Sequence, residues 1–271
     1  MGTTTKSKCQ MIIVLIVSLV ICSMAFSSPL LIAVEDEAEP WSYRDGTGFA
    51  NDIVRASFEA VGVETELSVV PYIRCKDMAI KGKAAACFSM SWLPEFEGKI
   101  VFSEKPLFTC YADYFFNSKK PLKATKEKDL PNGTVVGVVS GYEYPPSVYA
   151  LKDKGILKFE ESASEELNLK KLAMGRIDLA LVNHNEQKLT ALLMAKAGVS
   201  GQVRHAFRSG TLKSFIGFSI KHPQGKWMWE KFNKGYRIIS SNGVRHKIEQ
   251  KWKELALKEI ADLKGNSTKG K

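Results

Sequence analysis

Carboxylates and aromatic rings gather in two short stretches of this chain of 271 residues. The first stretch is acidic and then aromatic: Glu35, Asp36, Glu37, Glu39, Trp41 and Tyr43. The second stretch is Tyr142, Glu143 and Tyr144. Carboxylates beside aromatic faces suit a cationic ligand, by charge and by cation–π attraction. Acidic loop residues are also commonly solvated and without a ligand, so the pattern leaves both interpretations open.

Two serines stand where a buried strand is expected to end. Residues 84–88 are mostly apolar and have the length of a strand, and Ser89 and Ser91 follow them. A parallel α/β sheet binds ligands beyond the carboxyl ends of its strands, so both hydroxyls are predicted ligand contacts. Trp92 comes next, as a stacking platform or as packing. Arg74 lies at the start of a predicted helix and could hold a ligand anion or form a surface ion pair.

Other chemistries find little support in the residue pattern. The four histidines are scattered, no Cys/His cluster appears, and no Ser/His/Asp arrangement is visible. Glu143 is the one sharp candidate for acid–base catalysis. It lies beside a predicted helix whose N-terminus would lower its pKa, which favours binding a cation over donating a proton. We therefore predict no catalytic residue, no metal and no cofactor.

A regular alternation of strands and helices is expected to position these residues. The expected strands lie at residues 30–34, 67–70, 84–88, 134–139, 156–159, 177–182 and 214–220. The expected helices lie at residues 49–62, 72–81, 146–154, 167–174 and 183–195, followed by two more between 227 and 263. Strands that alternate with helices predict βαβ units and a mostly parallel sheet.

A series of local motifs runs through nearly the whole chain after residue 27. They are Pro40-Trp-Ser-Tyr43, Gly48-Phe-Ala-Asn-Asp52, Pro71-Tyr-Ile-Arg74, Lys81-Gly-Lys-Ala-Ala-Ala-Cys-Phe-Ser89, Ile100-Val-Phe-Ser103, Val136-Gly-Val-Val-Ser-Gly141, Met174-Gly-Arg-Ile-Asp178 and Ile248-Glu-Gln-Lys-Trp252. Their order and spacing resemble family 3 of the bacterial extracellular solute-binding proteins, the amino-acid-type binding subunits of ATP-driven importers.

The resemblance implies an α/β, two-lobe periplasmic-binding-protein fold of type II. Each lobe would be a mostly parallel sheet flanked by helices, and two crossover hinge segments would join the lobes. Residues 28–110 and 211–271 would form lobe one, and residues 111–210 would form lobe two.

The resemblance also implies where a ligand would bind, and several of those positions are unusual here. Ser89 and Ser91 match two hydroxyls that hold the ligand carboxylate in amino-acid binders of this family. The position of the carboxylate-holding arginine is Phe96, and the position of the ammonium-holding aspartate is Asn183. Phenylalanine cannot replace a bidentate, always charged partner, and asparagine offers no countercharge. A free α-amino acid held in the usual way is therefore not expected.

The predicted binding residues combine these positions with the acidic and aromatic stretches and with Arg74. They are Glu37, Trp41, Tyr43, Arg74, Ser89, Ser91, Trp92, Tyr142, Glu143 and Asn183. Trp92 and Phe96 could instead pack one lobe against the other.

The resemblance implies a monomeric, extracytoplasmic protein that captures a small polar solute, either amino-acid-like or cationic. The lobes would close over the solute and deliver it to the permease subunits of an ABC importer. The same fold occurs in exported dehydratases of prephenate- or arogenate-like substrates and in sensor domains of receptors. An enzyme of the cyclohexadienyl or arogenate dehydratase type and a ligand-sensing accessory protein are therefore the alternatives.

The N-terminus predicts export to the periplasm. Lys6 and Lys8 precede the apolar residues 11–20, and small residues follow, which is the order of a signal peptide. We expect cleavage to remove residues 1–27; an uncleaved anchor is the alternative. Cleavage lowers the net charge of +10 by two. The remaining lysines are scattered, so a nucleic-acid partner is not expected.

Three cysteines follow the predicted signal peptide: Cys75, Cys87 and Cys110. An exported protein can form disulfides, but the odd number leaves at least one thiol unpaired. Cys87 and Cys110 lie in apolar strands and are expected to be buried as small apolar side chains. The sequence does not say which of the three form a pair.

Overall fold

Strands and helices alternate along most of the chain in the computed structural model, which describes residues 30–36 and 38–269. The predicted signal peptide, residues 1–27, and Glu37 lie outside the described residues. The strands are β1 (Leu30–Glu35), β2 (Thr65–Val70), β3 (Ala86–Met90), β4 (Ile100–Phe102), β5 (Phe108–Asn117), β6 (Thr134–Val139), β7 (Leu157–Ser162), β8 (Leu179–His184) and β9 (Val203–Ser219). The helices are α2 (Phe49–Glu59), α3 (Tyr72–Lys81), α4 (Pro146–Asp153), α5 (Glu165–Ala173), α6 (Thr190–Lys196), α7 (Gly225–Ser241) and α8 (Val244–Lys269).

The strands lie in the order β2-β1-β3-β9-β5-β8-β6-β7, and β4 pairs with β9. The neighbours β1 and β3, β6 and β7, and β6 and β8 are parallel, as βαβ units require. Every pair formed by β5 or β9 in this order is antiparallel. The sheet is therefore mixed, with parallel βαβ units on either side of two antiparallel strands.

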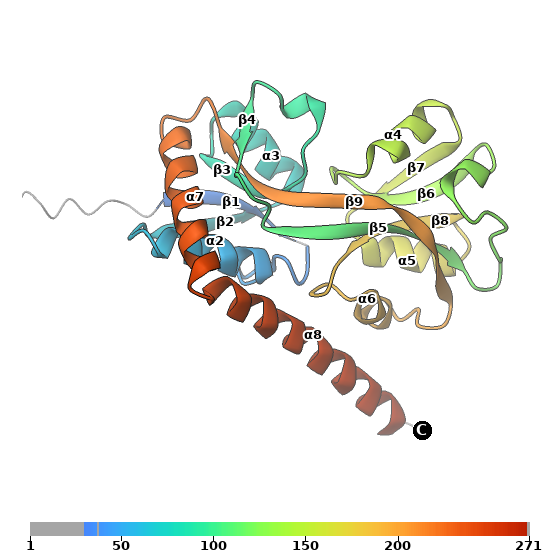
Figure 1. Cartoon of the computed structure of the whole chain (residues 1–271). Coiled ribbons are helices and arrows are strands. Elements are labelled where there is room, and N and C mark those ends of the chain that lie inside the picture. The colour runs from blue at the N-terminus through green and yellow to red at the C-terminus, as the bar shows by residue number, and fades with distance from the viewer. Residues whose placement is uncertain (1–29, 37, 270–271) are drawn as a thin grey trace, which may run out of the picture. The chain divides into compact units, whose positions relative to one another are not determined.

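The two antiparallel strands connect two lobes. Figure 1 shows β5 and β9 running from the helices around β1–β4, which we call lobe one, to the helices around β6–β8, which we call lobe two. β9 pairs with β3 and β4 near its C-terminal end and with β5 along the rest of its length. The chain thus has the two-lobe fold of periplasmic binding proteins. The lobe boundaries predicted from the sequence fall inside β5 and β9 and stay a prediction.

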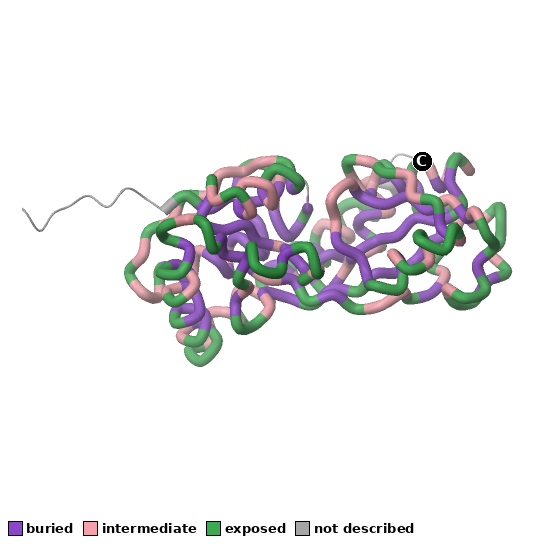
Figure 2. Tube along the Cα trace, turned by 90° about the horizontal axis from the view of Figure 1, so that it is seen from above, coloured by how far each residue is buried: buried purple, intermediate pink, exposed green. Residues whose placement is uncertain are grey.

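Each lobe has a core of its own, which Figure 2 shows as buried segments inside both lobes. In lobe two, successive residues of β8 point to opposite faces of the sheet. Leu179 and Leu181 belong to one apolar cluster, and Ala180 and Val182 belong to the other. In lobe one, Phe96 is 1% exposed within the core cluster. Helices α7 and α8 pack on α2, and α8 also contacts α6.

One disulfide lies in lobe one and joins Cys75 of α3 to Cys87 of β3. Cys110 is buried and free. The expectation that Cys87 is a buried small apolar residue is therefore right about burial and wrong about the thiol, because its sulfur is bonded to that of Cys75.

Two expected elements begin at quite different residues in the structure, and β4 is a strand that was not expected. The helix expected at 183–195 begins only at Thr190, because the preceding residues complete β8 and a turn. In that turn the side-chain oxygen of Asn185 accepts the backbone N–H groups of Gln187 and Lys188 at 3.1 and 2.9 Å, a local bond that competes with helix formation. β9 begins at Val203 rather than at Ser214. No helix among the described residues has the length and apolarity to cross a membrane.

Candidate functional site

A small cavity lies between the lobes, where the ends of several strands meet. Its walls come from both lobes and from the connecting strands: Glu35, Trp41, Tyr72, Ser89, Ser91, Phe108, Cys110, Tyr142, Glu143, Asn183, Leu212 and Ser214. The space open to the centres of water-sized molecules is about 20 Å³, which is room for roughly one water molecule or one ammonium group.

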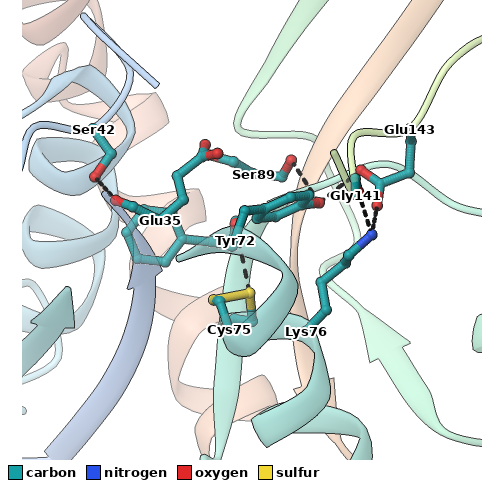
Figure 3. The surroundings of a disulfide bond; sticks show 10 residues. Glu35, Ser42, Tyr72, Cys75, Lys76, Ser89, Gly141 and Glu143 are labelled. Carbon is teal, nitrogen blue, oxygen red and sulfur yellow. Dashed lines mark hydrogen bonds and ion pairs between the residues drawn. A yellow bond between two sulfur atoms is a disulfide. The ribbon is translucent and has the colours of Figure 1, made fainter. Parts of the chain in front are cut away.

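Glu35 and Ser89 reach this cavity because β1 and β3 are parallel neighbours. Ala33 pairs with Cys87, so the two strands end side by side. Ser89 has a φ of +66°, a left-handed conformation that is uncommon outside glycine and often found at functional sites. The pairing of β3 with β9 shifts register around it. The chain after β1 is fixed by Ser42, whose hydroxyl donates to the backbone carbonyl of Glu35 at 2.7 Å (Figure 3).

The Glu35 side chain is the carboxyl of the cavity that has no ion-pair partner among the described residues. The residue is 3% exposed, and burial raises the pKa of Glu35 to about 8, because burial outweighs the opposing effects of the Ser89 hydroxyl and the Lys188 ammonium. Among residues 30–36 and 38–269, no cationic side chain lies within 4 Å of the Glu35 carboxyl. The nearby lysines, Lys76 and Lys188, pair with Glu143 and Glu165 instead. A buried carboxyl of this kind gains strongly from a cationic partner.

Glu143 occupies the opposite wall and is fully engaged. Its carboxylate accepts from the Tyr72 hydroxyl at 2.6 Å, from the Lys76 ammonium at 2.8 Å and from the Ser91 backbone N–H at 3.3 Å. Figure 3 shows Tyr72 and Lys76 pointing at this carboxylate from lobe one. Burial raises the pKa of Glu143 even though these donors act against it. The lowering expected from a helix N-terminus is thus wrong, because the carboxyl is buried between the lobes.

A second buried ion pair lies near the cavity and was missed in the sequence. The Lys188 ammonium is 2.6 Å from the Glu165 carboxylate, whose other oxygen accepts the Asn183 backbone N–H at 2.7 Å. The same ammonium lies 4.2 Å from the centre of the Trp41 ring. Lys188 follows closely on β8, so the strand-end rule that selected Ser89 could also have selected Lys188.

Three polar atoms in the cavity wall have no hydrogen bond within the described part of the chain: Ser89 Oγ, Asn183 Oδ1 and Ser214 Oγ, all of them buried. The Ser89 hydroxyl still acts on Glu35 by lowering the pKa of that carboxyl. The amide nitrogen of Asn183 donates to the backbone carbonyl of Glu143 at 3.4 Å, so its oxygen is left as an acceptor. Buried polar atoms are rarely left unpaired. With the Glu35 carboxyl, these atoms offer a set of acceptors to the three donors of an ammonium group.

The structure brings six of the ten predicted binding residues to the cavity: Trp41, Ser89, Ser91, Tyr142, Glu143 and Asn183. The other four are not among its lining residues. Tyr43 stacks on Trp252 with a ring separation of 5.9 Å. Arg74 is exposed, Trp92 is 56% exposed, and Glu37 lies outside the described residues. Glu35 belongs to the acidic stretch singled out in the sequence, but it was not among the ten predicted binding residues. Tyr72 and Ser214, which also line the cavity, were not predicted at all.

Two wider spaces adjoin the cavity and share residues with it. One of about 470 Å³ is bordered by Glu35, Tyr72 and Tyr142, and another of about 230 Å³ is bordered by Tyr142 and Glu165. Tyr142 lines the cavity and both wider spaces. A ligand larger than an ammonium group would therefore extend past the Tyr142 ring.

Comparison with known proteins places the fold. No protein-family model matches the sequence, and no curated protein is significantly similar to it. Among solved structures, the chain is similar to a histidine kinase sensor domain with similarity to periplasmic binding proteins, with 17% identity, a TM-score of 0.70 and coverage of 83% of this chain and 96% of that one.

Two further structures have the same fold. An ancestral arginine-binding protein bound to arginine has 20% identity and a TM-score of 0.69, over 83% of this chain and 97% of that one. The ancestral amino-acid-binding protein AncCDT-1, a precursor of cyclohexadienyl dehydratase, has 18% identity and a TM-score of 0.66, over 86% of this chain and 98% of that one. Similarity at this level of identity establishes the fold, and the function has to come from the site.

Proposed function

We propose that this protein binds a small cationic solute in the cavity between its lobes. The observation that carries the proposal is the buried carboxyl of Glu35, which has no cation within 4 Å among the described residues, beside the unpaired acceptors Asn183 Oδ1 and Ser214 Oγ. A primary ammonium group would donate hydrogen bonds to all of them. Its positive charge would also stabilise the ionised form of Glu35.

Aromatic side chains support the same ligand class. Trp41 and Tyr142 line the cavity, and Trp41 already lies under the ammonium of Lys188 at 4.2 Å. Its ring therefore stands in surroundings that favour cations. The arginine-bound relative gives a precedent for a cationic ligand on this fold, and the chemistry of the present cavity rests on residues of this chain.

The ligand would act by stabilising the closed arrangement of the lobes. Groups from both lobes contact the cavity, so a ligand seated there bridges them and shifts an open–closed equilibrium toward the closed form. Two ion pairs outside the cavity link the same parts of the chain: the Lys196 ammonium lies 3.0 Å from Glu39 and 2.9 Å from Glu259. The connecting strands β5 and β9 are the expected hinge.

Export and delivery to a transporter complete the proposal. The signal-peptide pattern of residues 1–27 supports a periplasmic location for the mature protein. The resemblance to solute-binding proteins supports permease subunits of an ABC importer as its partners. A ligand-sensing accessory protein would bind the solute in the same way. It would differ only in its partner, because a receptor rather than a permease would bind the closed form.

A thermal-shift screen tests the ligand class. We expect methylammonium, putrescine and agmatine to include compounds that raise the melting temperature, because each supplies a cation with N–H donors to Glu35. Acetate and succinate should not raise it. Calorimetric titration of the best compound then gives its affinity. The matched control is Glu160→Gln, which removes a carboxylate paired with Lys171 at 2.8 Å on the surface of lobe two. A screen in which only carboxylates stabilise the protein would overturn the proposal.

A dehydratase is the second candidate, because a pKa of about 8 would let Glu35 act as an acid at neutral pH, and the pKa of Glu143 is raised by burial as well. The structure of AncCDT-1 gives a precedent for the fold. A cavity of about 20 Å³ does not itself hold a cyclohexadiene ring, so such a substrate would have to lie mostly in the wider space of about 470 Å³ beside it. Turnover of prephenate or arogenate that is lost in Glu143→Gln would favour this candidate over binding.

A further inference from the structure

We propose that Glu143 of lobe two fills a carboxylate-binding cradle on lobe one, and that this makes the site select amines that carry no carboxylate group. The inference rests on the proposed function, which supplies the amine, and it names the feature that would exclude amino acids. The cradle consists of the Tyr72 hydroxyl, the Lys76 ammonium and the backbone N–H of Ser91.

The cradle has the chemistry of a carboxylate site. Lys76 contacts one oxygen of Glu143, while Tyr72 and Ser91 contact the other. All three donors belong to lobe one: Tyr72 and Lys76 reach the carboxylate from α3, as Figure 3 shows, and Ser91 follows β3. Donors arranged in this way bind an ionised carboxylate with charge-assisted hydrogen bonds. The group that they hold in this protein is supplied by the chain itself.

The pairing is buried and therefore hard to displace. The side chains of Glu143 and Lys76 are 3% and 12% exposed. The Lys76 ammonium also donates to the backbone carbonyl of Gly141, and it lies 4.8 Å from the centre of the Tyr72 ring. Removing one partner from a buried ion pair leaves an uncompensated charge. A ligand carboxylate would have to expel Glu143 and leave it without its donors.

Glu143 thus favours amines without a carboxylate group over amines that carry one. A carboxylate that enters the cavity meets the Glu143 carboxylate already seated in the cradle, so it finds no free donor set and is repelled by the charge of Glu143. An ammonium group meets Glu35, Asn183 Oδ1 and Ser214 Oγ. The rest of an amine would extend past Tyr142 into the wider space of about 470 Å³.

Pairs of ligands that differ only by a carboxylate test the selection. Agmatine is compared with arginine, and cadaverine with lysine, by calorimetric titration of the wild-type chain. We expect the amine of each pair to bind about 100-fold more tightly, because a site whose buried polar groups would be left unpaired discriminates strongly. In Glu143→Ala the preference should fall by at least about tenfold, because the cradle becomes available to the ligand carboxylate. The surface variant Glu160→Ala should keep the wild-type ratio.

Chemical rescue tests the cradle without any amine. Acetate should raise the melting temperature of Glu143→Ala and leave that of the wild-type chain unchanged. The double variant Glu143→Ala/Lys76→Met should lose the response, because its cradle lacks the ammonium. Glu143→Ser offers the same test if the alanine variant does not fold. Exchange of the Ser91 amide hydrogen, followed by mass spectrometry, should speed up in either single variant and slow down again with acetate.

The two experiments fail in different ways. If acetate rescues the variant but no amine binds the wild-type chain, the cradle stands and the proposed function is wrong. If amines bind but acetate has no effect on either single variant, the cradle inference is wrong. Equal binding of agmatine and arginine by the wild-type chain would also overturn the inference, even with a working cradle.

Discussion

Asp113 on β5 and Glu35 at the end of β1 are both buried carboxyls, 3% exposed each, yet their surroundings are opposite. One oxygen of Asp113 lies 2.8 Å from His184 Nε2 and 3.0 Å from His205 Nε2, and the other accepts from Arg208 Nε at 2.9 Å. Glu35 has no cation within 4 Å among the described residues, and its carboxyl lines the cavity between the lobes.

The surroundings move the two pKa values in opposite directions. Burial alone would raise the pKa of Asp113, but His184 and Arg208 together outweigh burial and hold it well below its usual range. For Glu35 burial wins and raises the pKa to about 8. A buried carboxyl whose partners come from the chain fixes the fold, whereas one whose partner is missing is suited to a ligand. The comparison suggests where mutations should separate stability from binding.

The largest expected effect comes from Glu35→Gln. It should weaken binding of the best amine by about 100-fold, because truncating one partner of a buried charge pair costs at least about 2 kcal/mol. The free energy of unfolding should not decrease at pH 8, since the variant removes a carboxylate that is costly to bury. Titration calorimetry and denaturant unfolding measure the two quantities. An unchanged affinity would place the amine elsewhere.

Asp113→Asn should do the reverse. We expect the free energy of unfolding to fall by about 2 kcal/mol, because charge-assisted hydrogen bonds to His184 and Arg208 are lost. Amine affinity should stay within about twofold of the wild-type value, since Asp113 does not line the cavity. If Asp113→Asn instead weakened amine binding and left the free energy of unfolding unchanged, the contrast between a structural Asp113 and a ligand-binding Glu35 would be wrong.

Asn183→Ala should weaken amine binding by about tenfold, because it removes one neutral acceptor of the ammonium group. Ser91→Ala should change affinity less than about twofold, because Ser91 contributes its backbone N–H to the Glu143 cradle and keeps it in the variant. Calorimetric titration of both variants with the same amine measures the ratio. Equal losses would indicate that the Ser91 hydroxyl contacts the ligand directly.

The dependence of binding on pH gives the smallest but most specific effect. The amine binds the ionised form of Glu35, so its affinity should rise as the pH increases toward about 8 and level off above that value. Binding at neutral pH should release a proton, and titrations in buffers of different ionisation enthalpy can measure it. Glu35→Gln should remove both the rise and the proton release.

The two carboxyls should also shape stability in opposite ways. The folded-state pKa of Glu35 is raised, so its contribution is fully present below about pH 4 and declines as the pH rises toward about 8. The folded-state pKa of Asp113 is lowered, so its contribution is present above about pH 4 and is lost on acidification. Comparing denaturant unfolding of the wild-type chain with Glu35→Gln and Asp113→Asn across this pH range measures both trends.

Local patterns predicted the elements well where apolar periodicity is strong. The helix at 72–81 and the strand at 134–139 have the same bounds in sequence and structure. β9 was found only from Ser214 onward, because its first residues are polar and gain their place by pairing with β5. Strand pairing over a long sequence separation leaves no local signal.

The candidate site shows the same division. Ser89 and Glu143 could be selected because they stand at strand ends or in an unusual stretch of residues. Tyr72 and Lys76 could not, since they lie on a helix whose sequence only indicates that it is amphipathic. Their roles come from the approach of α3 to a loop of lobe two, more than 60 residues away in the sequence.

The disulfide between Cys75 and Cys87 links the oxidation state of the protein to its ligand site. It ties α3, which carries Tyr72 and Lys76, to β3, which leads into Ser89. Disulfides persist in oxidising compartments and are rare in the cytosol. We expect the reduced protein, which lacks this tie, to bind amines more weakly when titrated with and without dithiothreitol. Under the export proposed above, the chain would gain the tie only outside the cytosol, so it would not capture cytosolic amines before it leaves.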